Sequence, residues 1–412
     1  MNNQTKPKLR NINVQQIVYQ GEPAFVLHDS QRLTDAVIVL PQALGPLALL
    51  CDGKHTIPEI KAALEGRYSL PLPLDTIENL LDQFDQALLL DGQTYDQARQ
   101  KAIDEFRVAP FRPSALAGGS YPADPDDLRH KLQRYLDQVD EIPASPATSR
   151  GLISPHIDYP RGGSVYAKVW ASAAEAVREV ELVIIVGTDH NGNLGTLTPT
   201  CQNYATPLGM LPTDKALVQR LADALGPDFA FADELHHRTE WSLELVMVWL
   251  QYMRGEKPCP VLPVLCGSFL HYMVGQANIK DEPRFKTFVE LLREEMSQRR
   301  TLVVASGDLA HLGPQFDGPP LDETAQAQME ADDKCLLNAL RQGNAGSFFE
   351  FMQAGQYQRN VCGLSPFYFM FDLLGETQGQ SIAYARCPAE HDGRKFLPNG
   401  SSFVSVCGMV FE

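Results

Sequence analysis

Three histidines in this sequence each follow a short apolar run. The runs are RGLIS, ELVIIVG and TLVVASG, and the histidines just beyond them are His156, His190 and His311. An aspartate lies within three positions of each: Asp158, Asp189 and Asp308. Imidazole binds transition metals and exchanges protons near neutral pH, and a neighbouring carboxylate can fix its tautomer. The spacing indicates a metal or acid–base site, although Asp158 and Asp189 also suit turns or helix caps.

The segments around these histidines alternate between predicted strands and predicted helices. Apolar, β-branched runs at 181–187, 258–267, 301–309 and 403–411 predict strands. Helical patterns separate or flank them at 125–139, 164–180, 214–225, 242–253, 284–299, 323–342 and 366–374. This alternation predicts an α/β fold with a central, mostly parallel sheet and helices on both faces. Ligands of such sheets bind beyond the carboxyl ends of the strands, so we expect the three histidines to meet at one edge.

The first part of the chain has a different pattern. Short strand-like runs at 16–19, 23–27 and 36–40 precede helical patterns, a composition typical of a small winged-helix-like domain. Thr56 and Glu59 form a capping-box pattern, and Asp75 is placed to cap the next helix. We therefore predict a domain over 1–92, a linker over 93–113 that begins as a charged helix, and an α/β domain over 114–412.

Composition limits the classes of function. The formal net charge of −16 argues against a nucleic-acid-binding surface over the whole protein, although it leaves room for a local basic patch. No run approaches the roughly 18 apolar residues that a membrane helix needs, and the polar N-terminus has no signal-peptide core. The eight cysteines include no CxxC pair, which favours free thiols in a reducing, cytoplasmic setting. Phosphate-loop, GxGxxG and GxSxG motifs are absent from the sequence.

Eight motifs occur in the order expected of MEMO family proteins, also called AmmeMemoRadiSam system protein B. They are RPSALAGGSYPADPDDL, SPHIDYPRGGSVYA, VGTDHNG, YATPLGMLPTD, EWSLELVMVWLQ, VLPVLCG, SGDLAH and CGLSPF. The resemblance covers 112–412. It implies a fold similar to class III extradiol dioxygenases, which use non-haem iron(II).

The resemblance also implies a set of site residues. His156 of PHIDY, His190 of GTDH and Cys362 of CGLSP match the metal ligands. Asp308 and His311 of SGDLAH would line the same pocket, with His311 as general acid or base. Histidine and thiolate suit a divalent transition metal, with iron(II) favoured and zinc or copper also compatible.

Two positions depart from the pattern of the family. Trp241 stands where members often carry a histidine, so a proton-donor role for this position is in doubt. PHIDYPRGG replaces the common PHAGY, and the pair Asp158 and Arg161 would make the pocket more polar and suited to an anionic substrate group. We also place Asp189 and Glu244 among the substrate-binding candidates.

Other polar residues near these motifs have a structural alternative. Glu240 and Glu244 lie four apart at the start of a predicted helix, where a carboxylate either joins the site or interacts with the helix dipole. We interpret His236 and His237 as loop residues.

Three functions are compatible with the sequence. The first is an iron-dependent oxygenase-like or redox enzyme acting on a small molecule, and the second is a metal-binding adaptor without catalysis. The third is a peptide-handling partner of radical-SAM and AMMECR-like proteins, which the family's association implies. LLCDGKHTIPEIKAALEGRY and IENLLDQFDQALLLDG resemble PqqD-like peptide-binding winged helices, although a structural or dimerisation domain fits them equally well.

Overall fold

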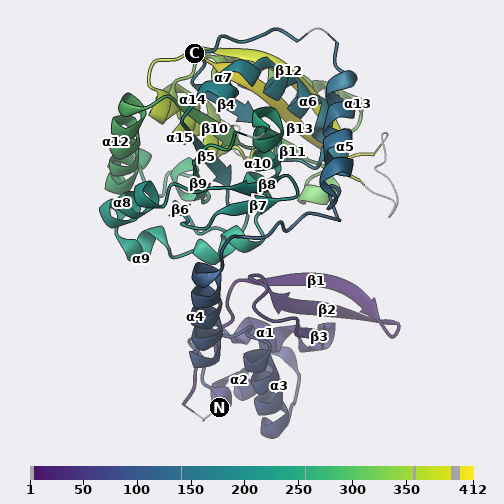
Figure 1. Ribbon diagram of the computed structural model, residues 1–412. Coiled ribbons are helices and arrows are strands. Elements are labelled where there is room, and N and C mark those ends of the chain that lie inside the picture. The colour runs from purple at the N-terminus through teal and green to yellow at the C-terminus, as the bar shows by residue number, and fades with distance from the viewer. Residues whose placement is uncertain (1–3, 141, 256, 356–358, 391–399) are drawn as a thin grey trace. The chain divides into compact units, whose positions relative to one another are not determined.

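The computed structural model describes the 412-residue chain except for residues 1–3, 141, 256, 356–358 and 391–399. The chain divides into two compact units, Met1–Val108 and Ala109–Glu412 (Figure 1). Each unit has its own hydrophobic core.

The N-terminal unit packs a three-stranded antiparallel sheet against helices. The strands, in spatial order, are β1 (Ile12–Tyr19), β2 (Glu22–Asp29) and β3 (Val37–Pro41). The helices are α1 (Gly45–Leu50), α2 (Ile57–Tyr68), α3 (Leu74–Gln86) and α4 (Gln93–Val108). Leucine and isoleucine side chains from β2, β3 and the first three helices form the buried core.

Local signals explain where these helices begin. The capping box predicted at α2 is confirmed: Thr56 caps the backbone, and Glu59 accepts from the Thr56 amide at 2.8 Å. The predicted cap of α3 is wrong, because the helix begins at Leu74 after Pro73 and Asp75 lies in its first turn. There the Asp75 carboxylate still interacts favourably with the helix dipole. Residues 93–108, expected to open the linker, form the continuous helix α4.

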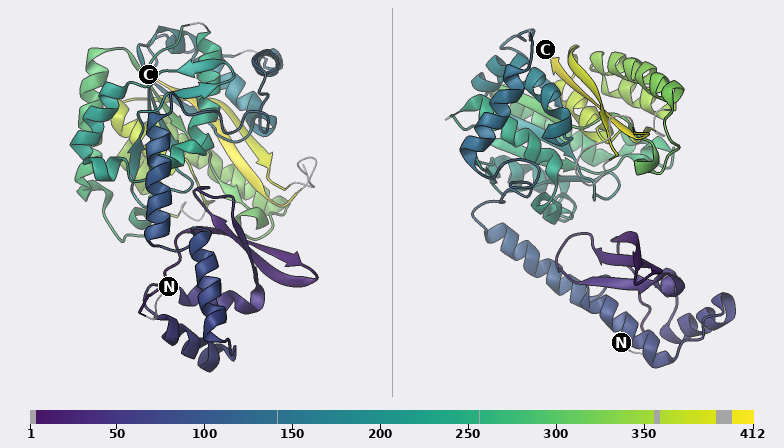
Figure 2. Two further views of the ribbon diagram at one scale, coloured as in Figure 1. Left: turned by 60° about the horizontal axis from the view of Figure 1, so that its bottom comes forward. Right: turned by 90° about the vertical axis from the view of Figure 1, so that its right-hand side faces the viewer.

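The C-terminal unit is built on an eight-stranded sheet (Figures 1 and 2). Its four central strands are parallel and lie in the order β4 (Gly151–Ser154), β10 (Thr301–Ser306), β5 (Leu182–Thr188) and β9 (Val261–Cys266). Antiparallel strands flank them: β13 (Phe403–Phe411), β12 (Gly379–Pro388), β11 (His311–Leu312) and β6 (Leu197–Pro199). A separate hairpin joins β7 (Tyr204–Thr206) and β8 (Gly209–Leu211).

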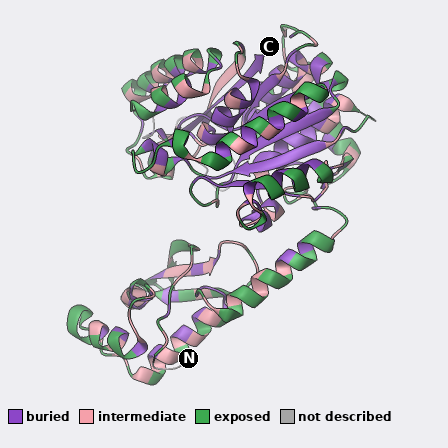
Figure 3. Cartoon of the chain, turned by 90° about the vertical axis from the view of Figure 1, so that its left-hand side faces the viewer, coloured by how far each residue is buried: buried purple, intermediate pink, exposed green. Residues whose placement is uncertain are grey.

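Helices cover both faces of this sheet, which confirms the predicted α/β fold. Successive residues of β5 enter different cores: Val183 and Ile185 pack on one face, and Ile184 and Val186 on the other. The first face is covered by α5 (Pro125–Asp137), α6 (Tyr159–Ser172), α7 (Ala174–Glu179) and α10 (Trp241–Arg254). The second is covered by α8 (Lys215–Leu225), α12 (Pro283–Gln298), α14 (Ala345–Gln353) and α15 (Leu364–Leu374). The four central strands are buried along their length, and Figure 3 shows buried strands between the helices of this unit.

The remaining helices are short, apart from α13. They are α9 (Pro227–Ala230), α11 (Leu270–Met273), α13 (Glu323–Arg341), and the 3-10 turns η1 (Gln42–Leu44), η2 (Glu234–Arg238), η3 (Ile279–Asp281) and η4 (Pro314–Phe316).

The helix predicted over 164–180 is in fact two helices. The first, α6, begins five residues earlier because Asp158 caps it and Pro160 occupies its first turn. Strand β12 and helix α14 were not predicted. Among the described residues, no helix is both long and apolar enough to cross a membrane.

Candidate metal centre

A cavity of about 770 Å³ opens at the carboxyl edge of the central strands. Residues that follow β4, β5 and β10 line it together with the segment before α15, as the topology of a parallel sheet requires. Its polar lining includes His156, Asp158, Arg161, His190, Asp308, His311 and Cys362. The structure thus brings together seven of the nine residues singled out in the sequence.

Asp308 fixes the loop that carries His156. Asp308 Oδ1 accepts hydrogen bonds from the backbone amides of His156 at 2.9 Å and Ile157 at 3.3 Å. These two residues follow β4, whereas Asp308 follows β10, the neighbouring strand. The aspartate therefore joins two strand ends and holds the first histidine in place.

Asp308 also fixes the position of Cys362. The Asp308 amide donates to Cys362 Sγ at 3.3 Å, and the Gly363 amide donates to the Asp308 carbonyl at 3.0 Å. The two backbones approach so closely that a Cβ on Gly307 would lie 2.4 Å from the Gly363 Cα. Glycine at 307 therefore permits the contact that brings the thiol to the strand end.

Two imidazoles and this thiol converge on one point. Cys362 Sγ lies 3.2 Å from His156 Nε2, and the rings of His156 and His190 meet edge to face at 4.9 Å. One ligand atom of each of these three residues lies within 4.8 Å of the others, a spacing suited to a single metal ion. Asp308, His311 and Cys362 satisfy the same criterion, so all five side chains surround one small volume.

Glu240 sets the orientation of His190. Its carboxylate oxygens lie 3.0 and 3.1 Å from His190 Nδ1, and one accepts from the His190 amide at 3.0 Å. Nδ1 is therefore the protonated nitrogen, and the Nε2 lone pair is left for a metal. Trp241 stacks on the imidazole with centroids 4.1 Å apart and planes 19° from parallel. The ring is thus held at its edge and across its face.

His311 is held in a similar way by backbone carbonyls. Its Nδ1 lies 3.1 Å from the Leu309 carbonyl and 3.0 Å from the Asn360 carbonyl. Two acceptors at Nδ1 require a proton there, so Nε2 is again the basic nitrogen. Burial lowers the pKa of His311, so its neutral form is favoured.

Burial and neighbouring charges shift the pKa values of the other groups in the site. Burial, followed by the charge of His190, lowers the pKa of His156 to about 3, so this imidazole stays neutral. Burial opposes the charged form of His190 too, but the Glu240 carboxylate outweighs it and raises the pKa of His190. Burial raises the pKa of Cys362, so the thiol without a metal is protonated. A bound cation would displace that proton.

Asp158 and Arg161 form an ion pair on the cavity wall. Arg161 Nε donates to Asp158 Oδ2 at 2.6 Å, and Arg161 Nη1 donates to the Pro388 carbonyl at 3.2 Å. Asp158 also caps α6, so its carboxylate serves the helix as well as the pair. The guanidinium thus faces the cavity with its charge compensated by Asp158.

Two predicted substrate-binding residues lie outside the described lining of this cavity. Asp189 is buried, and its Oδ2 lies 2.9 Å from His236 Nδ1. Glu244 is fully buried and pairs with Arg112, while its oxygens accept from the amides of Ala115 and Leu116 at 2.8 and 2.9 Å. Its carboxylate therefore anchors the segment that enters the C-terminal unit.

The histidines expected in a loop have structural partners. Both His236 and His237 lie in η2 and are buried. His237 contacts the Tyr204 hydroxyl at 2.5 Å and the Thr198 carbonyl at 2.9 Å.

The sequence left the role of Glu240 open between the site and the helix dipole, and it did not predict that Trp241 packs on His190. Glu240 directly precedes α10 and Trp241 is its first residue. The Glu240 carboxylate accepts from the amides of Trp241 and Ser242 at 2.8 and 2.9 Å. The available signal was a glutamate at a helix start close to a histidine-rich edge. The neighbouring Glu244 gave the same signal, and only the three-dimensional structure distinguishes the two.

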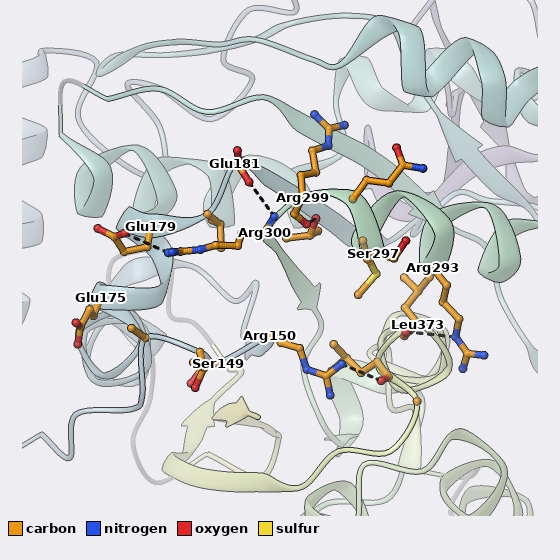
Figure 4. A pocket seen from close by; sticks show the side chains of 18 residues that line it. Ser149, Arg150, Glu175, Glu179, Glu181, Arg293, Ser297, Arg299, Arg300 and Leu373 are labelled. Atoms are coloured by element: carbon orange, nitrogen blue, oxygen red, sulfur yellow. Dashed lines mark hydrogen bonds and ion pairs between the residues drawn. The ribbon is translucent and has the colours of Figure 1, made fainter.

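A larger cavity of about 960 Å³ lies at the opposite, amino edge of the sheet (Figure 4). Its arginines already have partners: Arg300 pairs with Glu179 at 3.2 Å, and Arg293 donates to backbone and carboxylate oxygens of Asp372. Its described lining contains no histidine or cysteine. Volume alone therefore does not identify the functional site.

Known proteins resemble this chain over most of its length. A "MEMO1 family protein" of Aquifex aeolicus is 23% identical over 409 residues, covering 98% of this chain and all of the relative. "Protein memo-1 homolog" of Caenorhabditis elegans is 29% identical over 266 residues, covering 63% of this chain and 70% of the relative. A Thermus thermophilus "MEMO1 family protein" is 27% identical over 331 residues, covering 80% and 93%. Residues 112–395 match the model of the Memo-like protein family, and the chain therefore belongs to that family.

Proposed function

We propose that this protein is a metal-dependent redox enzyme of the oxygenase type that acts on a small molecule. The observation that supports this is the convergence of His156, His190 and Cys362, with one ligand atom from each within 4.8 Å of the others. Three protein ligands beside an open cavity are typical of catalytic rather than structural metal sites.

The donor set fits a divalent transition metal. Two imidazole nitrogens and a thiolate suit iron, zinc or copper, whereas magnesium and calcium prefer oxygen ligands. We favour iron(II), which His156, His190 and Cys362 would hold and which would supply one-electron redox chemistry. The eight cysteines are all free thiols, which supports a reducing, cytoplasmic setting for such an ion.

The remaining cavity residues bind substrate and move protons in this proposal. His311 Nε2 takes a proton from the substrate or returns it, since Nδ1 is occupied by two carbonyls. Asp308 stabilises the imidazolium that forms. Arg161 and Asp158 offer a donor and an acceptor to a polar group of the substrate, and Trp241 and Phe316 flank its apolar part.

The test pairs metal analysis with oxygen consumption. Protein purified under nitrogen without added metal should contain about one equivalent of iron. The iron-loaded protein should consume oxygen with a catechol, and the His311→Ala protein should do so far more slowly. A metal-loaded protein that consumes no oxygen with any catechol would contradict the oxygenase proposal.

A metal-binding adaptor is the second candidate, and Cys362 favours it. A thiol beside iron and oxygen is prone to oxidation, which a repeatedly cycling enzyme must avoid. Bound metal, absence of oxygen uptake and an intact thiol after exposure to air would together support the adaptor.

Association with radical-SAM and AMMECR-like proteins stays a proposal that rests on family resemblance. The N-terminal unit would then hold a peptide or the partner enzyme. Co-purification of such a protein with the full chain, and its loss when residues 1–92 are deleted, would support this role.

A further inference from the structure

The outer strand of the N-terminal sheet, β1, has an unprotected edge. It pairs with β2 on one side through all eight of its residues, Ile12 to Tyr19. Within the described part of the chain, no backbone hydrogen bond reaches its other side. A strand edge of this kind presents unpaired amides and carbonyls that can pair with another strand.

The other edge of the same sheet is different. Strand β3 has only five residues, ends at Pro41 and follows Asp35. Short length, proline and charge are the usual means by which proteins protect an edge from pairing. Strand β1 has none of them, since residues 11–21 (NINVQQIVYQG) contain neither proline nor a charged side chain.

This sheet also carries a large share of the exposed apolar side chains. Val14, Val18 and Tyr19 of β1 are 58%, 75% and 50% exposed, and Val37 and Val39 of β3 are 51% and 38% exposed. These are five of the thirteen exposed large hydrophobic residues of the described chain. Three of the five lie on β1 itself, and exposed apolar side chains on a strand with an open edge indicate an interaction surface.

We propose that β1 pairs in antiparallel fashion with β1 of a second copy, so that two three-stranded sheets join into one of six strands. The charge of the chain favours this occupant. With a net charge of −16, most surfaces of two copies repel each other, whereas the strand from Asn11 to Gly21 is neutral.

Symmetry then restricts the register. A two-fold axis perpendicular to the sheet places the same face of both copies on the same side of the joined sheet. Side chains directly opposite each other must then point to the same face, so their residue numbers differ by an even number. A register centred on Gln16 meets this condition and sets Val14 of each copy opposite Val18 of the other. These are the two most exposed large hydrophobic residues of β1, and both lie on the same face as Gln16.

Charge substitution tests the pairing in the full-length chain by sedimentation velocity over a range of concentrations. The wild type should show a reversible monomer–dimer equilibrium. Val14→Lys should weaken the dimer by about tenfold or more, because a lysine must then be covered by Val18 of the other copy. Combining Val14→Lys with Val18→Glu should restore the dimer, since both contacts become ion pairs, whereas Val14→Lys with Val18→Lys should not.

The matched control is Val39→Lys, the same substitution at an exposed valine of β3, which should leave the dimer unchanged. Val14 and Val18 are largely solvent-exposed in one copy, so circular dichroism should show that the variants remain folded. A wild type that is monomeric up to its solubility limit would overturn the proposal. So would a dimer that Val39→Lys weakens and Val14→Lys does not.

Cross-linking tests the register independently. In a Cys335→Ser background, which removes an exposed thiol, Gln16→Cys should form an intermolecular disulfide under mild oxidation. Opposed strand residues have Cα atoms about 4.5–5.5 Å apart, within disulfide range. Asn13→Cys should not cross-link, because residue 13 of the other copy would lie six positions further along the strands, about 20 Å away. The reverse result would overturn the register, and binding of a foreign peptide to a monomeric chain would overturn the choice of occupant.

Discussion

The role of Glu240 can be tested by replacing it with glutamine. In the structure this one carboxylate accepts from His190 Nδ1, from the His190 amide and from the amides that begin α10. Glu240→Gln keeps the shape of the side chain but removes its charge and turns one acceptor into a donor. We therefore expect a folded protein in which the His190 ring is less firmly held and less basic.

The magnitude follows from this geometry. Groups that orient a metal-binding histidine typically contribute about 10- to 100-fold to metal affinity. The dissociation constant should rise by that factor, equivalent to about 1.4–2.7 kcal/mol. The thermal midpoint should fall as well, because charge-assisted hydrogen bonds to backbone amides are lost.

Competition titration with a chromogenic chelator would measure the affinity for cobalt(II) or zinc. The absorption band of cobalt bound to thiolate would show that Cys362 still binds. Glu282→Gln is the matched control, since Glu282 also caps a helix, α12, and accepts from the Arg284 amide at 3.1 Å. Unchanged affinity in folded Glu240→Gln protein, or equal weakening by Glu282→Gln, would refute the reasoning.

Three further predictions concern the ligands, His311 and the two units. His156→Ala, His190→Ala and Cys362→Ala should each remove most of the bound metal, measured by mass spectrometry, without unfolding the chain; full occupancy in any of them would exclude that residue as a ligand. His311→Ala should keep its metal near the wild-type content but lower turnover by about 10²- to 10⁴-fold, and loss of metal would instead identify His311 as a ligand. Limited proteolysis should cut between 95 and 119, most readily near Ala109–Phe111, where helix α4 has ended and Arg112 is not yet reached; a cut that unfolds both pieces would refute the boundary.

The fold of the C-terminal unit could be predicted because the spacing of apolar residues in the sequence follows from which residues are buried. The continuous apolar runs of β5, β9, β10 and β13 reflect strands buried on both faces. Strand β12 was not predicted, because it is only partly buried along most of its length. Its sequence, GQSIAYARCP, therefore shows no clear alternation of apolar and polar residues. The break between α6 and α7 also lacks a proline or glycine, and only the end of the hydrogen-bonded segment reveals it.

The site was predictable to the extent that chain topology places it. Three strand ends that carry histidines had to meet at one edge, and they line one cavity. The choice between Glu240 and Glu244 depends on a single turn of helix α10: one carboxylate faces His190, and the other faces Arg112. Arg112 lies 132 residues away from Glu244, and no local pattern could reveal a partner so distant in sequence.

Asp308 connects the metal-binding and proton-transfer parts of the site, and two substitutions can separate its roles. Its Oδ1 holds the amides of His156 and Ile157, whereas Oδ2 lies 3.8 Å from His156 Nε2. Asp308→Asn keeps an oxygen that can accept from both amides, so metal content should stay close to that of the wild type, while turnover falls because the negative charge beside the imidazoles is lost. Asp308→Ala removes the acceptor and should release the His156 loop, lowering metal content as well. Equal metal loss in both variants would mean that the charge of Asp308, and not its hydrogen bonds, assembles the site.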